Sequence, residues 1–400
     1  MSAESPFKLS VPDAKLDILR QKLALAEFPD ELENAEWNYG VPLADIKRLV
    51  AYWKDGYDWR AQEARLNKEL PQFTKDIDVD GFGTLNIHYV HQKSPVSNAI
   101  PLLFVHGWPG SFFEVQKILP LLVQSSPESP SFHVVAPSLP GYGFSEGAHK
   151  PGFAAEQYAE VAHKLMLSLG YDEYVTQGGD WGFLITRTIA LKYGGKHSKA
   201  WHTNWAAGLP PRFILNPIVY LQHLVTPYTP AEKAGIERTK WLMKEGRGYF
   251  EEQSTKPQTL GYSLADSPVG LLAWVYEKLV TWTDAYSWTD DEVLTWIMIF
   301  YVSRSGPAAS IRIYYEVMHS TPARARPSIP LGVSHFPKEL RITPRKFLYT
   351  IGNVKFQAEH PIGGHFAAYE RPDDLVGDLR KMFGKNGPAF GVVPGKDGYE

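Results

Sequence analysis

The segment Gly178–Gly182, with the sequence Gly-Gly-Asp-Trp-Gly, constrains the fold of this chain more than any other stretch. A short apolar strand is expected at 174–176 before it, and a strongly helical run at 183–190 follows it. The small residues allow strand and helix to approach closely and allow the central residue to adopt a strained backbone conformation. This pattern predicts that Asp180 is presented as a nucleophile, and a carboxylate nucleophile favours displacement at a saturated carbon over ester hydrolysis.

The segments around this turn alternate between expected strands and expected helices. Continuous apolar strands are expected at 101–105 and 132–136, and a helix at 155–169 leads to the turn. Such alternation predicts right-handed connections and a mostly parallel central sheet. Together with the nucleophile turn, it indicates the α/β-hydrolase fold.

Two further regions flank and interrupt this core. The N-terminal part carries two amphipathic helices and a hairpin at 76–91. After Trp205 the chain becomes helical, aromatic and punctuated by proline, which is typical of a helical lid over the C-terminal edge of the sheet. The expected regions are an N-terminal extension at 1–95, the first part of the core at 96–205, the lid at 206–325, the second part of the core at 326–385 and an irregular tail at 386–400.

Local signals place several elements within these regions. Strands are expected at 347–351 and 354–357, where the chain returns to the sheet, and a last helix at 375–383. The pairs Ser111 with Glu114 and Thr289 with Glu292 match the S/T-x-x-E capping box, so each is expected to open a helix.

Composition excludes several classes of function. The chain has 400 residues, no cysteine and a formal net charge of −3. Disulfides, thiolate metal sites and cysteine nucleophiles are therefore excluded, and nothing indicates a nucleic-acid partner. No signal peptide and no membrane-spanning run is evident, so a cytoplasmic location is expected. The chemistry of a carboxylate nucleophile requires neither a metal nor a cofactor, and none is predicted.

A carboxylate nucleophile needs a base that activates water, and His365 is the candidate. It follows Gly363 and Gly364 in a loop after the last expected strand, in the chain order nucleophile, acid, histidine. Glu339, expected in the loop before the penultimate strand, is the candidate acid that orients the base, and Glu359 is its competitor. On this basis His365 would titrate on the acidic side of neutrality.

An oxyanion hole is the next requirement. Its candidate donors are the backbone N–H of Trp181, directly after the nucleophile, and that of Trp108 in the His-Gly-Trp-Pro loop. We expect the peptide bond between Trp108 and Pro109 to be cis, because the tight loop has to aim an amide inward.

These motifs together resemble the microsomal-type epoxide hydrolases, including their soluble fungal relatives. The matching segments run in the same order through nearly the whole chain: His106–Ser111, Gly179–Gly182, Asp266–Gly270, Phe336–Glu339 and Gly363–Ala368.

The resemblance implies a role for each matched position. Asp180 corresponds to the nucleophile, His365 to the base and Glu339 to the orienting acid. Tyr249 and Tyr314 correspond to two lid tyrosines that assist ring opening, and for the second of these the adjacent Tyr315 is an alternative. The soluble branch of the family lacks a membrane anchor and often forms homodimers.

The expected activity is the addition of water to an epoxide, through an ester on Asp180, to give a vicinal diol. The aromatic lid favours a mainly apolar substrate, and neither cofactor nor metal is implied. A haloalkane or haloacid dehalogenase is an alternative, because it uses the same Asp–His–acid set. A homologue that binds a small apolar ligand without turnover is another.

Overall fold

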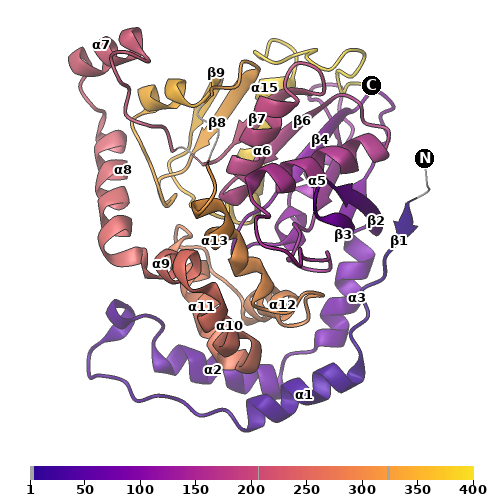
Figure 1. Ribbon diagram of the computed structural model, residues 1–400, viewed down its shortest axis with the longest axis vertical. Coiled ribbons are helices and arrows are strands. Elements are labelled where there is room, and N and C mark those ends of the chain that lie inside the picture. Colours follow the sequence, from indigo (N-terminus) through magenta and orange to yellow (C-terminus); the bar gives the residue numbers. More distant parts are fainter. Residues whose placement is uncertain (1–3, 206, 322–324) are drawn as a thin grey trace.

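The computed structural model describes residues 4–205, 207–321 and 325–400. Within them a central sheet has the strand order β1-β2-β3-β5-β4-β6-β7-β8-β9 (Figure 1). The pairings of β1 with β2, β2 with β3 and β3 with β5 are antiparallel, and the pairings from β5 to β9 are parallel. The strands are β1 (Ser5–Pro6), β2 (Gln72–Val79), β3 (Gly83–Gln92), β4 (Ile100–Val105), β5 (Phe132–Pro137), β6 (Tyr174–Gly178), β7 (Ser198–Thr203), β8 (Pro330–His335) and β9 (Asn353–Glu359).

Helices cover both faces of the parallel part of this sheet. In Figure 1, α5 and α6 lie in front of the strands and α15 lies behind them. Every residue of β4 and of β6 is buried, as expected for strands covered on both sides. The helices of the core are α4 (Leu119–Val123), α5 (Ala155–Ser168), α6 (Trp181–Lys192), α14 (Ala367–Glu370) and α15 (Pro372–Phe383).

The lid consists of helices between β7 and β8. Thr289 and Glu292 form the predicted capping box at the start of α12. Residues 206 and 322–324, at the two ends of the predicted lid, lie outside the described residues. The lid helices are α7 (Pro217–Val225), α8 (Pro230–Trp241), α9 (Gly248–Thr255), α10 (Pro257–Asp266), α11 (Pro268–Thr281), α12 (Asp290–Tyr301) and α13 (Arg312–Met318).

The N-terminal extension packs against the lid. Helices α1 (Asp13–Ala24) and α2 (Leu43–Asp55) contact α11, and α2 also contacts α12, below the lid in Figure 1; α3 (Trp59–Glu69) leads back to the sheet. Arg48 forms an ion pair with Asp290, and the Tyr52 hydroxyl donates to Asp291 over 2.9 Å. Two acidic residues in the first turn of α12 are therefore tied to the extension. None of the described helices has the length and apolar character needed to cross a bilayer.

Two predictions about local structure are wrong. Residues 347–350 of the segment expected as a strand lie in a 3-10 helix, Arg345–Thr350, and the strand beside β9 is instead β8, which was not predicted. Ser111 caps only a 3-10 turn, Phe112–Val115, by accepting a hydrogen bond from the N–H of Phe113. The Glu114 side chain does not complete a capping box, because it turns into the molecule beside Gly110.

Candidate active site

The nucleophile turn joins the end of β6 to the start of α6. Asp180 has a φ of 50°, a left-handed conformation that side chains rarely adopt and that costs about 1–3 kcal/mol. A β-carbon on Gly182 would lie 2.0 Å from the carbonyl oxygen of Val105, so only glycine allows α6 to approach β4 this closely. Close packing of strand and helix therefore fixes the turn and presents the Asp180 side chain above the sheet edge.

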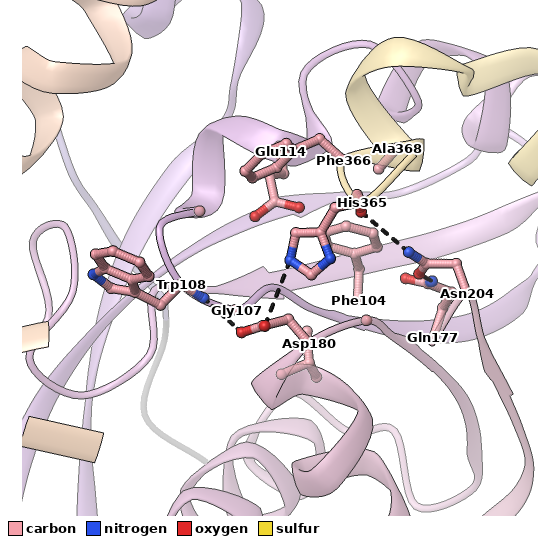
Figure 2. Close-up of a pocket in the computed structure, with 13 residues that line it drawn as sticks. Phe104, Gly107, Trp108, Glu114, Gln177, Asp180, Asn204, His365, Phe366 and Ala368 are labelled. Atoms are coloured by element: carbon pink, nitrogen blue, oxygen red, sulfur yellow. Dashed lines mark hydrogen bonds and ion pairs between the residues drawn. The ribbon is translucent and has the colours of Figure 1, made fainter. Parts of the chain in front are cut away.

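The loop after β4 orients the Asp180 carboxylate (Figure 2). The backbone N–H of Trp108 donates to Oδ1 of Asp180 over 2.8 Å. A β-carbon on Gly107 would lie 2.2 Å from the same oxygen, so glycine leaves the space that the carboxylate occupies. The Trp108–Pro109 peptide bond is cis, as expected. Trp108 thus binds Oδ1, and Oδ2 lies on the side of the His365 ring.

His365 lies between two carboxylates. Its Nε2 is 3.5 Å from Oδ2 of Asp180, and its Nδ1 is 2.6 Å from Oε1 of Glu339. Glu339 is fully buried and also accepts a hydrogen bond from the N–H of Leu340. The sequence predicted Glu339 before the penultimate strand. That strand is β8, and Glu339 lies in the loop after it. The competitor Glu359 pairs instead with Arg345.

Backbone contacts hold the loop of His365 to both the sheet and the lid. The N–H of His365 donates to the carbonyl of Trp282 at the end of α11 over 2.8 Å. Its carbonyl accepts from Nδ2 of Asn204, and Oδ1 of Asn204 accepts from Gln177 on β6. A β-carbon on Gly364 would lie 2.4 Å from the Trp282 carbonyl, which explains glycine before the histidine.

The charges around His365 determine its protonation. Burial lowers the pKa of the imidazole, but the carboxylates of Glu339 and Asp180 outweigh burial and raise that pKa to about 10. The ring is therefore cationic at neutral pH in the site as it stands. The expectation from the sequence that His365 titrates on the acidic side of neutrality is therefore wrong for the site without substrate.

Two lid tyrosines lie close to the nucleophile. The rings of Tyr249 on α9 and Tyr314 on α13 are buried, with centroids 5.9 Å apart. Trp108 stacks on Tyr249 at 5.5 Å, and Trp181 meets the edge of Tyr314 at 4.7 Å. Burial, reinforced by the charge of Asp180, raises the pKa of both phenols, so both are protonated at neutral pH.

The neighbour Tyr315 faces away from this group. It is 38% exposed and stacks on the ring of His319, with centroids 4.0 Å apart. Of the two adjacent tyrosines, Tyr314 is thus the one that packs on Tyr249 and Trp181, next to Asp180.

Glu114 belongs to the site, although the sequence assigned it only a capping role. Figure 2 shows its carboxyl turned toward the His365 ring, beside a cavity of about 20 Å³ that both residues line with Asp180. Burial raises the pKa of Glu114 to about 8, with a further increase from Asp180 and opposing effects of His365 and a Gly107 hydrogen bond. The apolar residues around it in Phe112–Val115 are the signal that could have placed Glu114 inside.

An aspartate on a strand–helix elbow, a histidine after the last strand and a buried glutamate define a hydrolase of the α/β-hydrolase class. Family comparison agrees, because the family described as alpha/beta hydrolase fold matches residues 100–205 and the family described as Epoxide hydrolase N terminus matches residues 4–115.

Individual relatives define the family more closely. A protein of Stigmatella aurantiaca is 37% identical, over 95% of this chain and 84% of its own. Epoxide hydrolase 1 of Sus scrofa is 35% identical, over 95% of this chain and 88% of its own. The structure of Aspergillus niger epoxide hydrolase superimposes with a TM-score of 0.83 at 36% identity, covering 94% of this chain and 95% of that one. The chain belongs to the epoxide hydrolases, in the microsomal-type group with an N-terminal extension.

The charge environment of His365 leads to a testable titration. Because Asp180 raises the pKa of His365, the ring should stay cationic at pH 8 in the unmodified protein, and Asp180→Asn should lower its pKa by roughly one unit or more. Nitrogen-15 NMR of labelled histidine rings, assigned with His365→Gln, measures this. Glu359→Gln is the matched control and should change nothing. A neutral His365 ring at pH 8 in the unmodified protein would contradict the expectation.

Proposed function

We propose that this enzyme converts an apolar epoxide to a vicinal diol through a covalent ester on Asp180. The observation that carries the proposal is the placement of one carboxylate between the Trp108 N–H, the His365 ring and two protonated lid phenols. Oδ2 of Asp180 attacks a ring carbon, and the carbon–oxygen bond of the strained ring breaks.

Tyr249 and Tyr314 supply the acid that ring opening requires. The leaving oxygen would otherwise become a strongly basic alkoxide, and one phenol donates its proton while the other supports the developing charge. Such general-acid assistance contributes typically ~10²–10⁴ in rate. A phenol suits this task because it is protonated at neutral pH yet far more acidic than an aliphatic alcohol.

The site begins and ends this cycle with the same charges. At the start Asp180 is anionic and His365 cationic. Alkylation neutralises Asp180, which removes one of the two carboxylates that hold the proton on His365. The proton that His365 loses passes to the tyrosinate that ring opening leaves, so both phenols are restored and the imidazole is neutral when it is needed as a base.

Hydrolysis of the ester completes the cycle. Neutral His365 takes a proton from water, and the oxygen of that water attacks Cγ of Asp180. The N–H groups of Trp108 and Trp181 stabilise the oxyanion, each contributing about 3 kcal/mol. When the Cγ–O bond to the product breaks, the second proton of the water passes to the departing oxygen, so the diol leaves and Asp180 is again a carboxylate.

The lid chemistry favours an epoxide over an alkyl halide. A departing halide needs N–H donors and no proton, whereas a departing epoxide oxygen needs an acidic hydroxyl. The two buried phenols supply such hydroxyls, and the aromatic rings of Trp108 and Trp181 beside them favour an apolar substrate. With nucleophile, base and acids all present, turnover is favoured over ligand binding alone.

The covalent route is tested by a single turnover in ¹⁸O-water with excess enzyme and styrene oxide. The first diol should be unlabelled and the label should enter the Asp180 carboxylate, because the diol takes its new oxygen from that side chain. His365→Gln should stop at the ester, which intact-mass spectrometry detects as an adduct. Label that appears directly in the first diol would contradict the proposal.

The tyrosine roles predict that ring opening slows when either hydroxyl is lost. Tyr249→Phe and Tyr314→Phe should each reduce the rate of alkylation on the order of 10²-fold. Stopped-flow tryptophan fluorescence with styrene oxide follows this step, since Trp108 and Trp181 contact these rings. Tyr315→Phe is the matched control and should leave the rate unchanged; an equal loss in this variant would argue against the assignment.

We also propose that the protein forms a homodimer through the surface of α7. In Figure 1, α7 projects from the body of the molecule, and it contains no buried residue. A nine-residue helix is below the ~12–15 residues that a helix needs to be marginally stable alone in water. The exposed apolar residues in and before α7 are Leu209, Phe213, Ile214, Leu215, Ile218, Leu221, Leu224 and Val225.

The size and chemistry of this surface fit a second copy of the chain. Its eight apolar side chains, each more than half exposed, gather on one short segment, whereas the exposed apolar residues of a monomer are normally scattered singly. Helix α7 contains no lysine or arginine, unlike helices that lie on membranes.

Sedimentation velocity tests the homodimer. The unmodified protein should sediment as a dimer at micromolar concentration, and Leu221→Glu should sediment as a monomer because it places a charge within the apolar surface. Tyr262→Glu, at an exposed position on α10, is the control and should remain dimeric. A monomer at all concentrations, or binding to lipid vesicles in its place, would contradict the proposal.

A further inference from the structure

The small cavity beside Asp180 is built separately from the lid. Its lining residues come from β4 and the following loop, the nucleophile turn, the end of β6, Asn204 after β7 and the segment around His365. Its volume of about 20 Å³ fits one water molecule, which needs roughly 10–15 Å³. An epoxide with an alkyl or aryl group does not fit. The two tyrosines and this cavity therefore serve different reactants.

We propose that this cavity holds the water that hydrolyses the ester and that Glu114 is the residue that positions it against His365 and Cγ of Asp180. Glu114, His365 and Asp180 give such a water three polar partners, within the two to four typical of buried waters. The assignment deepens the proposed function and rests on it, because it concerns the second step of that reaction.

The local structure holds the Glu114 carboxyl at this place. Phe112, Phe113 and Val115 are fully buried, so the 3-10 turn that carries Glu114 is fixed on both sides by the core. A β-carbon on Gly110 would lie 1.5 Å from Oε1 of Glu114, so glycine provides the room for the carboxyl. The side chain cannot return to the capping position without leaving this space.

The protonation of Glu114 suits positioning rather than proton removal. Burial raises its pKa to about 8, so at neutral pH the carboxyl is mostly neutral. A neutral carboxyl accepts a hydrogen bond through one oxygen and donates one through the other. His365 is then the group that takes one proton as the water oxygen bonds to Cγ, and the second proton of the water passes to the departing oxygen when the Cγ–O bond to the product breaks.

The test separates alkylation from hydrolysis in single turnovers with styrene oxide. Glu114→Ala should alkylate within about twofold of the unmodified rate but hydrolyse the ester on the order of tenfold to a hundredfold more slowly, because the water loses its position. The adduct should then accumulate in intact-mass spectra. Glu114→Gln should restore hydrolysis to within about fivefold, since the amide also donates and accepts. Gln116→Ala, in the same segment and bonded to Glu69, is the matched control and should hydrolyse normally.

Three outcomes would overturn the assignment. Equal slowing in the alanine and glutamine variants would show that Glu114 removes a proton, and equal slowing of both steps in Glu114→Ala would show a structural role; thermal unfolding of each variant checks folding. If His365→Gln traps the ester and Glu114→Ala does not, only the role of Glu114 fails. If His365→Gln forms diol with no adduct, the covalent route itself fails.

Discussion

The interaction on which the site depends is the placement of the cationic His365 between the carboxylates of Asp180 and Glu339. Burying these charges is unfavourable unless each finds its partner, so the three side chains have to meet with little freedom. The parallel sheet achieves this, because Asp180, Glu339 and His365 follow the carboxyl ends of β6, β8 and β9. Trp108, which orients the nucleophile, follows the same end of β4. Four loops of one sheet edge therefore supply the site.

Hydrogen bonds and an ion pair connect the site to the lid, and the lid to the N-terminal extension. His365 is bound through its backbone to Trp282 of the lid, and the N–H of Gly363 donates to the carboxylate of Asp284. The lid is in turn bound to the extension through the first turn of α12. The base, the two phenols and the extension thus share one connected framework. The extension is remote from Asp180 in sequence, yet it packs against α11 and α12 of the lid.

The sequence predicted the parts of this protein whose signals are local. The nucleophile turn, the parallel strands before it and the capping box at Thr289 depend on short patterns, and the structure contains each of them. Periodicity could not distinguish an apolar 3-10 segment at 347–351 from a strand, and β8 interrupts its apolar residues with glycine and polar side chains. Glu114 matched the capping-box pattern, and that pattern takes no account of the apolar residues beside it, Phe112, Phe113 and Val115, which are buried. The choice between Tyr314 and Tyr315 depends on which face of α13 is buried, and tertiary packing determines that face.

The charge balance of the site also controls the order of the proposed steps. While Asp180 is a free carboxylate, it keeps the proton on His365, so the imidazole cannot activate water. In the proposed mechanism, conversion of Asp180 to an ester removes that charge, and His365 becomes available as a base only when there is an ester to hydrolyse. The Trp108 N–H would serve both states of the proposed cycle, since the oxygen that it binds in the carboxylate is the oxygen that would become the oxyanion. One arrangement of donors and charges is thus sufficient for two chemically different steps.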